Sequence, residues 1–287
     1  MHRKRQCFKQ GLKRMKMCEK VQTQYTNTVY ETHEEVADML VLVTGASAGF
    51  GEATCRLLVE KGHKVIGAAR RLERLQNLQQ ELGASFFPLQ MDVSNLDDID
   101  AVLQHLPSEW QAIDVLVNNA GLALGLETAD KADFADWLKM INTNIIGLTY
   151  LTRQLLPIMV ARGRGHVINL GSVAGTYPYP GGNVYGATKA YVKQFSLNLR
   201  ADLVGTPIRV TNVEPGLCGG TEFSNVRFKG DDDKAAKVYE KVQYLTAEDI
   251  ANTIVWVAEQ PAHMNVNSIE IMPVAQAFSP FNVAREA

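Results

Sequence analysis

The sequence has 287 residues, of which 46% are hydrophobic and 21% are charged, and its formal net charge is -2. These proportions indicate a globular chain with a large buried core and exclude a chain that is disordered throughout. The near-neutral charge gives no general attraction for nucleic acid or an anionic membrane, and no apolar run approaches the roughly 18 residues of a membrane-spanning helix. We therefore expect neither nucleic acid nor a membrane as a partner.

The cysteines are scattered, without a C-x-x-C pair or nearby histidines: they are Cys7, Cys18, Cys55 and Cys218. This spacing predicts neither a zinc site nor a disulfide framework. A reducing compartment and a chain without a bound metal are the expectations that follow.

Residues 1–38 differ in composition from the rest of the chain. Up to Lys20 they are rich in Arg and Lys, with Glu19 as the single acid, and from there to Asp38 they are polar. Three interpretations compete: a disordered tail or upstream translated segment, an organelle-targeting peptide, and a basic arm for nucleic acid or lipid. We expect a disordered extension on a cytoplasmic protein, with organelle targeting as the alternative, and one catalytic domain over residues 39–287.

Seven short apolar runs alternate with longer amphipathic stretches along this domain. Their apolarity is continuous, which is typical of strands buried on both faces in a parallel sheet between helices. The predicted strands are residues 40–43, 65–69, 86–89, 113–117, 166–170, 208–213 and 268–272. The pattern predicts an α/β fold: a single Rossmann-type doubly wound domain with a seven-stranded parallel sheet.

Two long helices are predicted between the strands. The first covers residues 134–162, with Asn144 inside its apolar pattern, Pro157 expected to kink it and Gly163 following its end. The second covers residues 185–203. Core packing and a subunit interface are both open as explanations of its apolar face, which consists of Phe195, Leu199 and Leu203.

A glycine-rich turn follows the first predicted strand, with the sequence Thr44-Gly45-Ala46-Ser47-Ala48-Gly49-Phe50-Gly51. Its three glycines stand where a backbone must turn sharply, approach a ligand closely and open a helix, whose first N–H groups suit a pyrophosphate. The spacing G-x-x-x-G-x-G is less common than G-x-G-x-x-G. The strand before it and the helix after it nevertheless supply the context that dinucleotide binding requires.

The residues after the second predicted strand select the nicotinamide cofactor. A protein that prefers NAD places an acid there to hold the ribose hydroxyls, whereas this chain has Arg70 and Arg71. Guanidinium groups suit a 2′-phosphate, so NADP(H) is the predicted cofactor. The alternative is that both arginines are solvated residues of the following helix.

Two further loops complete the predicted dinucleotide site. Asp92, which precedes Val93 just past the third strand, either accepts from the adenine amino group or caps the helix that begins near Asn95. The fourth strand ends in small residues that let the backbone pass beneath the ribose and adenine, namely Asn118, Asn119, Ala120 and Gly121.

Tyr185 and Lys189 are four residues apart and therefore lie on one face of a predicted helix. A phenol has a pKa of about 10, and an ammonium a few ångströms away stabilises its ionised form and lowers that pKa. Such a tyrosine can exchange a proton with a substrate oxygen. A pair with this spacing is weak evidence alone, and its order among the other motifs gives it weight.

The motifs together resemble those of the short-chain dehydrogenase/reductases over essentially all of residues 39–287. The matching positions are Thr44, Gly45, Gly49, Gly51, Asn118, Asn119, Ala120, Gly121, Asn144, Ser172, Tyr185, Lys189, Pro215 and Gly216. More narrowly, residues 49–52, 182–189 and 219–228 resemble the NADP-dependent 3-hydroxy acid dehydrogenases, a group of serine or L-allo-threonine dehydrogenases and malonic semialdehyde reductases. The resemblance implies an enzyme that interconverts the 3-hydroxyl of small 3-hydroxy acids and the 3-oxo form by hydride transfer, and a homotetramer.

The resemblance also implies the catalytic residues. Ser172 donates to the substrate oxygen, Tyr185 exchanges the proton, and Lys189 lowers the tyrosine pKa and holds the nicotinamide ribose. Asn144 holds a water beside this lysine through its backbone carbonyl; the alternative is a satisfied polar group at a helix irregularity. The predicted cofactor-binding residues are Thr44, Gly45, Ser47, Gly49, Phe50, Gly51, Arg70, Arg71, Asp92, Val93, Asn119, Ala120, Gly121, Tyr185, Lys189, Pro215 and Gly216.

Substrate choice is expected in the loop after the sixth strand, over residues 216–241. Arg227 and Lys229 are its available cations, and a guanidinium contact from Arg227 to a carboxylate would explain a preference for hydroxy acids. Arg227 could instead bind the cofactor phosphate or Glu222. An acidic turn that starts a helix, rather than a metal site, is expected at Asp231, Asp232 and Asp233.

Two rival functions remain open. One is the NADPH-dependent reduction of a different carbonyl compound, which would use the same catalytic residues. The other is a non-catalytic NADP-binding sensor or scaffold of the same fold, which would have no need of an intact Ser172, Tyr185 and Lys189.

Overall fold

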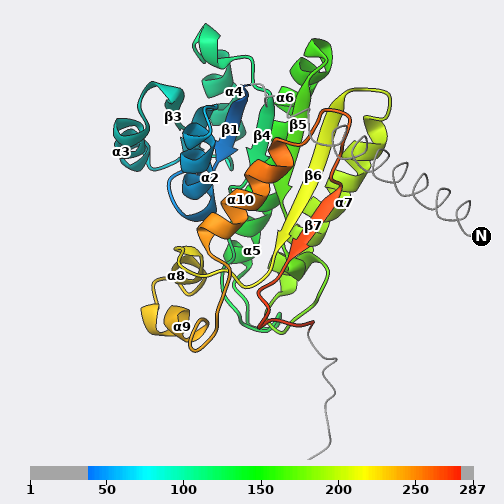
Figure 1. The fold of residues 1–287 in the computed structure, drawn as a ribbon. Coiled ribbons are helices and arrows are strands. Elements are labelled where there is room, and N and C mark those ends of the chain that lie inside the picture. The colour runs from blue at the N-terminus through cyan, green and yellow to red at the C-terminus, as the bar shows by residue number, and fades with distance from the viewer. Residues whose placement is uncertain (1–37, 279–287) are drawn as a thin grey trace, which may run out of the picture. The chain divides into compact units, whose positions relative to one another are not determined.

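The computed structural model of the protein describes residues 38–278, so all of the predicted extension except Asp38 lies outside the described residues. Within this range, seven parallel strands form one sheet with the order β3-β2-β1-β4-β5-β6-β7 (Figure 1). The strands are β1 (Leu40–Thr44), β2 (Lys64–Ala69), β3 (Phe86–Gln90), β4 (Val115–Asn118), β5 (Gly165–Leu170), β6 (Ile208–Pro215) and β7 (Ser268–Ile271). The predicted doubly wound α/β fold is confirmed.

The strands form at the apolar runs because both faces of the sheet are covered. Every residue of β1 and β5 is buried, whereas β7 at the edge of the sheet is partly exposed throughout. β4 begins at Val115 and not at the predicted Ile113, which is buried but bonds through its N–H to Gln111 in a turn. The strand order reverses between β1 and β4, and an open α/β sheet has a crevice at that point.

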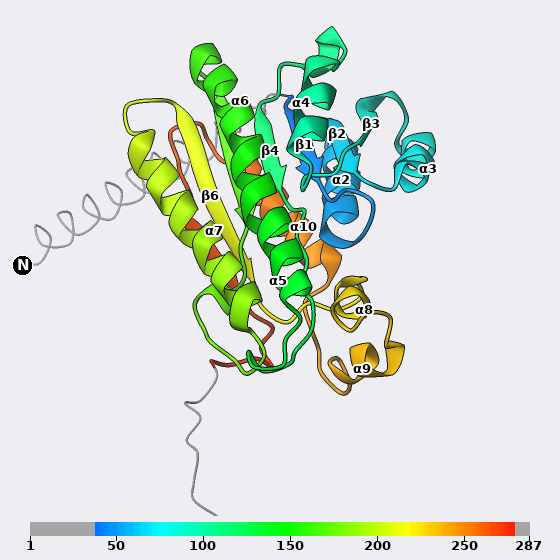
Figure 2. The same cartoon turned by 180° about the vertical axis from the view of Figure 1, so that it is seen from behind.

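Helices cover the sheet on both faces, as the two opposite views show (Figures 1 and 2). The helices of one face are α2 (Gly49–Glu60), α3 (Leu72–Leu82) and α10 (Ala247–Ala258), and those of the other are α4 (Leu96–Gln104), α6 (Leu148–Arg162) and α7 (Asn183–Asp202). Two short helices, α8 (Phe223–Arg227) and α9 (Asp232–Lys237), follow β6. Asp231 caps α9, as the acidic turn predicted. No helix among residues 38–278 is long and apolar enough to cross a bilayer.

The first of the two long predicted helices contains an irregular turn. α5 (Phe134–Ile141) continues into a π-helical turn, η3 (Asn142–Gly147), and then into α6. Pro157 lies inside α6, and Gly163 ends that helix in the left-handed region at φ 68°, as predicted. A π-helical irregularity therefore falls at Asn144, which lies in η3, and a kink at Pro157 stays a prediction. Single π-helical turns of this kind are frequent at functional sites.

The apolar residues predicted on α7 lie in different environments. Leu203 is buried in the core on that face of the sheet, and Leu199 packs against the same core. Core packing therefore explains both leucines. Phe195 instead stacks on Tyr191, with 5.7 Å between the ring centroids. The apolar side chains that stay exposed along α5, η3 and α7 include Phe134, Leu138, Ile146, Tyr191 and Leu197.

Candidate active site

A cleft of about 670 Å³ opens at the carboxyl ends of the strands, at the reversal of strand order. The predicted site residues that line it are Gly45, Ser47, Gly49, Phe50, Arg70, Arg71, Asp92, Val93, Asn119, Ala120, Gly121, Ser172, Tyr185, Lys189, Pro215, Gly216 and Arg227. Thr44, Gly51 and Asn144 contact these lining segments from behind. One cleft thus joins motifs that are spread over most of the domain.

The glycine turn allows two loops to approach each other closely. Gly45 and Gly49 have φ angles of 69° and 55°, in the left-handed region that glycine adopts without strain. A Cβ on Gly51 would lie 2.6 Å from Asn119 Nδ2, so a larger residue would push the loops apart. Ala48 gives α2 no side-chain cap. The first N–H groups of this helix are therefore free to bind an anion such as a pyrophosphate.

Thr44 fastens the glycine turn to the loop after β4. Its Oγ1 accepts from the N–H groups of Asn119 at 3.0 Å and Ala120 at 2.9 Å. The Asn119 side chain in turn donates to the Thr44 carbonyl at 2.8 Å. Thr44 is 1% exposed, so it supports the wall of the cleft and does not itself face the cleft.

The arginines predicted to select the cofactor form a cationic cluster with one acid. Arg71 donates to Ser47 Oγ at 3.1 and 3.2 Å and to Glu222 at 2.8 Å, and Arg74 also donates to Glu222 at 2.8 Å. Burial alone would raise the pKa of Glu222, but the hydrogen bonds from the two arginines lower it below its ordinary value. Two guanidinium groups thus share one carboxylate, which leaves a net positive charge that suits a phosphate, and Arg70 lines the same part of the cleft. Arg71 is thus bonded within the cleft, whereas the role of Arg70 stays a prediction.

Asp92 lines the cleft but does not cap the next helix. Its Oδ1 accepts from the N–H of Ser94 at 2.9 Å and from the hydroxyl of Ser94 at 2.7 Å. Asn95 caps α4 by accepting from the N–H of Asp98. The capping alternative for Asp92 is therefore wrong, and the contact to adenine stays a prediction.

Ser172, Tyr185 and Lys189 meet at the other end of the cleft, and each is at most 8% exposed. Ser172 follows β5, and its hydroxyl donates to the Pro215 carbonyl at 3.3 Å. Lys189 Nζ lies 5.9 Å from the centroid of the Tyr185 ring and donates to the Leu170 carbonyl at 2.6 Å. The helix spacing predicted from the sequence does place the phenol and the ammonium together.

Burial dominates the titration of these two groups. It raises the pKa of the Tyr185 phenol well above the ordinary value, although a hydrogen bond with Ser172 and the charge of Arg227 act in the opposite direction. Burial also lowers the pKa of Lys189 to about 8. Burial sets the direction of the pKa shift of both groups in the protein by itself, and the lowering of the tyrosine pKa by Lys189 stays a prediction.

Asn144 closes the π-helical turn behind the cleft wall. Its side chain accepts from the N–H of Leu122 at 2.9 Å, donates to the Leu122 carbonyl at 2.9 Å and donates to Thr188 Oγ1 at 3.0 Å. A Cβ on Gly121 would lie 3.3 Å from Asn144 Oδ1 and 3.5 Å from Lys189 Nζ, so the three residues converge. The side chain is satisfied at a helix irregularity, as the alternative foresaw. A water held by the Asn144 carbonyl stays a prediction.

Arg227 reaches into the catalytic end of the cleft from the end of α8. Its Nε donates to the Gly125 carbonyl at 3.1 Å, and its Nη2 donates to the Tyr179 hydroxyl at 2.8 Å. The guanidinium lies 5.6 Å from the centroid of the Tyr185 ring. A positive charge therefore stands directly beside the phenol.

The other candidates in the loop after β6 lie elsewhere. Lys229 pairs with Asp136 at 2.7 Å and does not line the cleft. Glu222 bonds the arginine cluster and not Arg227. The sequence did not predict that Glu222 pairs with Arg71 and Arg74, nor that Arg227 donates to the Tyr179 hydroxyl. Both contacts join segments that are far apart in the chain.

The fold and the cleft are those of a Rossmann-type oxidoreductase, with a serine, a tyrosine and a lysine at one end of the cleft. The family model of the short chain dehydrogenases matches residues 39–232, and the chain belongs to this family. The resemblance stated from the motifs is confirmed.

Relatives with assigned activities are similar over almost their whole length. A probable NADP-dependent dehydrogenase of Haemophilus influenzae is 62% identical over 245 residues, 85% of this chain and 97% of the relative. The NADP-dependent 3-hydroxy acid dehydrogenase YdfG of Escherichia coli strain K12 is 59% identical over 248 residues, 86% of this chain and 100% of the relative. A solved structure described as the closed form of serine dehydrogenase complexed with NADP+ matches at 59% identity with a TM-score of 0.86, covering 86% of this chain and 100% of that chain.

Proposed function

We propose that the protein is an NADP-dependent oxidoreductase that interconverts the 3-hydroxyl of small 3-hydroxy acids or β-hydroxy amino acids and the 3-oxo form. Serine, allo-threonine and 3-hydroxypropanoate are the expected substrates, and malonic semialdehyde is the carbonyl form of the last. One observation carries the proposal: the Arg227 guanidinium lies 5.6 Å from the ring of Tyr185 in the same cleft. A carboxylate bound to this arginine would bring a hydroxyl two carbons away close to the phenol.

The ribose end of the cleft supports NADP(H) as the cofactor. Arg70 and Arg71 line it, and the nearby carboxylate of Glu222 is occupied by Arg71 and Arg74. The relatives described above are named as NADP-dependent. When bound, the nicotinamide supplies a hydride to the 3-oxo carbon or accepts one from the hydroxyl-bearing carbon.

Three side chains would handle the substrate oxygen. The Ser172 oxygen accepts from the N–H of Ala174 at 3.1 Å, and its hydroxyl donates to the Pro215 carbonyl over a long 3.3 Å, so the hydroxyl proton can turn to the substrate instead. Tyr185 keeps its proton at neutral pH because burial raises its pKa, and this suits it to protonate the oxygen during reduction. Lys189, with a pKa of about 8, would then stabilise the phenolate and hold the cofactor ribose.

The neighbours of Arg227 leave it ready for an anion. Bonds from Nε to Gly125 and from Nη2 to Tyr179 fix the plane of the guanidinium. Nη1 has no hydrogen-bond partner among residues 38–278, so its two N–H groups are available to a carboxylate. The contact would separate a hydroxy acid from a plain alcohol.

The substitution Arg227→Ala tests this assignment. We expect the KM for L-serine and for 3-hydroxypropanoate to rise roughly 100-fold, which corresponds to ~3 kcal/mol for a lost charge-assisted contact. The dissociation constant of NADPH should stay within about twofold, because the arginine cluster at the ribose end is untouched. Lys229→Ala is the matched control, since that neighbouring cation lies outside the cleft.

The outcomes separate the rival functions. An unchanged KM for the acids in Arg227→Ala would contradict the carboxylate contact. Turnover of uncharged carbonyls, without turnover of the acids, would favour a different reductase. No turnover of any carbonyl by a wild-type protein that binds NADPH would favour a sensor or scaffold.

We also propose that the protein is a cytoplasmic homotetramer. The exposed Phe134, Leu138 and Ile146 along α5 and η3 support an interface, because an apolar surface of this kind is usually covered in an assembly. The scattered cysteines suit a reducing compartment. Light scattering on the purified chain tests the assembly, and a monomeric mass would contradict it.

A further inference from the structure

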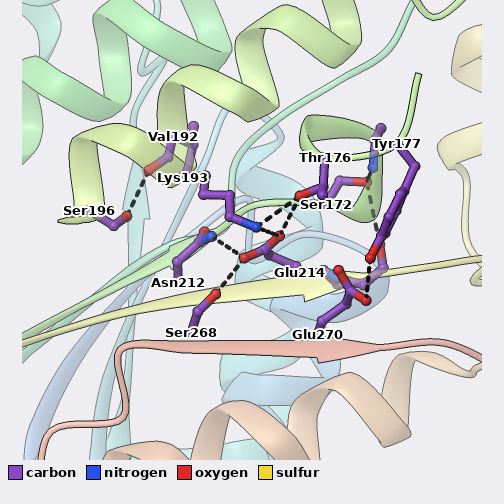
Figure 3. A network of polar contacts seen from close by, with 12 residues as sticks. Ser172, Thr176, Tyr177, Val192, Lys193, Ser196, Asn212, Glu214, Ser268 and Glu270 are labelled. Atoms are coloured by element: carbon purple, nitrogen blue, oxygen red, sulfur yellow. Dashed lines mark hydrogen bonds and ion pairs between the residues drawn. The ribbon is translucent and has the colours of Figure 1, made fainter.

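Glu214 is a buried carboxylate at the carboxyl end of β6, with 1% of its surface exposed. Figure 3 shows the side chains around it. One carboxylate oxygen accepts from Lys193 Nζ at 2.9 Å and from Thr176 Oγ1 at 3.3 Å. The other accepts from Asn212 Nδ2 at 2.9 Å and from the Ser268 hydroxyl. Lys193 also donates to Thr176 at 2.8 Å, which closes the network.

The network is rigid for an electrostatic reason. A carboxylate removed from water stays ionised only when charged and polar partners replace the lost hydration. Lys193 supplies the opposite charge, and both oxygens of Glu214 are bonded. Loss of one partner would leave a buried charge incompletely satisfied, so the segments that carry the partners are held in one arrangement. These segments are α7, β6, β7 and the loop after β5.

One of these segments carries two of the catalytic groups. Lys193 follows Lys189 by one helical turn and Tyr185 by two turns, so all three side chains lie on the same face of α7. The ion pair with Glu214 therefore ties the catalytic face of α7 directly to β6. A shift of α7 along or around its axis would break this pair.

Two of the other segments, the loop after β5 and β6, carry the catalytic serine and its acceptor. Thr176 comes directly after the short helix η4 (Val173–Gly175), which follows Ser172. A Cβ on Gly175 would lie only 2.7 Å from the backbone carbon of Lys189, so η4 packs tightly against α7. Pro215, the residue after Glu214, supplies the carbonyl that holds the Ser172 hydroxyl.

We propose that Glu214 is a positioning residue for the reaction. Through Lys193 and Thr176 it sets the spacing between α7, the serine loop and β6, and so the geometry in which Ser172 and Tyr185 meet one substrate oxygen. The inference rests on the proposed function, because it concerns the rate of that reaction. Misplacement of a reacting group by about 1 Å can lower a rate by roughly 100-fold.

Lys193→Met in the full chain is the decisive variant, because the lysine side chain is 34% exposed whereas that of Glu214 is only 1% exposed. We expect kcat to fall by about tenfold or more, while the KM of the substrate and the dissociation constant of NADPH stay within about twofold. Lys193→Arg keeps the charge and should restore kcat to within about threefold of wild type. Glu214→Gln should lower kcat as Lys193→Met does, and the double variant should be little worse than either single one.

Arg162→Met is the matched control. Arg162 is 31% exposed and pairs at 2.6 Å with Asp114, a buried acid at the amino end of β4, far from the cleft along the strand. Its loss should lower the melting temperature and leave kcat within about twofold when measured well below that temperature. A pair that only stabilises the fold behaves in this way.

Each result decides between the claims. An unchanged kcat in Lys193→Met would overturn the positioning role, and so would a Lys193→Arg variant as slow as Lys193→Met. A rise in KM with constant kcat would assign the network to substrate binding and would also overturn it. A wild-type protein that binds NADPH but turns over no carbonyl would instead refute the proposed function, and the Glu214 inference with it.

Discussion

Replacing Lys189 by methionine should make the fold more stable at neutral pH while it removes activity. The lysine is 7% exposed, and the one hydrogen bond of its ammonium in the described chain goes to the Leu170 carbonyl. Burial lowers its pKa from the ordinary 10.5 to about 8, because a charged group loses its hydration there. The folded protein therefore carries a penalty whenever this ammonium is protonated, and methionine fills the same space without charge.

The magnitude follows from the pKa. At about 1.4 kcal/mol per pH unit, the difference between 10.5 and 8 corresponds to about 3 kcal/mol at pH 6. Loss of the hydrogen bond to Leu170 destabilises the variant by about 1 kcal/mol and so offsets part of this gain. The net gain for Lys189→Met is then about 2 kcal/mol, or a rise in melting temperature of roughly 5 °C for a domain of this size.

The sign of the pH dependence provides the sharper check. Between pH 8 and 10.5 the unfolded wild-type chain binds more protons at Lys189 than the folded chain does, so wild-type stability rises with pH in that window. The advantage of Lys189→Met should be constant below pH 8, shrink above it, vanish at about pH 9.8 and become a disadvantage of up to about 1 kcal/mol by pH 10.5. Urea unfolding of both proteins without added cofactor, at pH 6 to 10.5, measures it. A less stable variant at pH 6, or a difference that does not change with pH, would refute the reasoning.

Two further predictions concern the cofactor site. Arg70→Asp should weaken NADPH binding strongly and spare NADH binding. The control Arg153→Asp, on the exposed face of α6, should change the binding of neither cofactor. Fluorescence titration measures both dissociation constants, and an equal loss of affinity for the two cofactors would contradict the assignment. Gly51→Ala should weaken NADPH binding at least about tenfold, because its Cβ would lie 2.6 Å from Asn119 Nδ2. The control Gly62→Asn, at a left-handed position with open space around it, should bind NADPH as wild type does. Normal NADPH binding by Gly51→Ala would contradict the prediction, because it would show that the two loops can move apart.

The sheet could be predicted from the sequence because strands that are buried on both faces consist of continuous apolar runs. The boundary of β4 was wrong for the same reason. Ile113 is as buried as a strand residue, yet it lies in a turn, and apolarity does not distinguish the two. The glycine turn and the helix spacing of Tyr185 and Lys189 are local patterns, and they predicted the lining of the cleft.

The features that sequence reasoning missed depend on contacts between distant segments. A helix irregularity at Asn144 was one of the two interpretations, but the bonds of its side chain to the backbone of Leu122, in a loop that follows another strand, were not predicted. Glu222 meets Arg71 across 151 positions of the chain. The pKa of Tyr185 depends on how deeply the surrounding loops bury it, which no spacing of residues expresses. Each of these features can be predicted only when the folded positions of the distant segments are known.

In the proposed reaction the Tyr185 hydroxyl passes the proton while the cofactor passes the hydride. Phenylalanine at this position keeps the buried ring and its packing against Phe223, at 5.9 Å between centroids, and removes only the hydroxyl. NADPH binding and steady-state turnover of malonic semialdehyde should therefore be measured side by side for wild type and Tyr185→Phe. For Tyr185→Phe we expect a dissociation constant within about twofold of wild type and a loss of turnover of about 1000-fold or more. Substantial turnover by the phenylalanine variant, with normal NADPH binding, would contradict it.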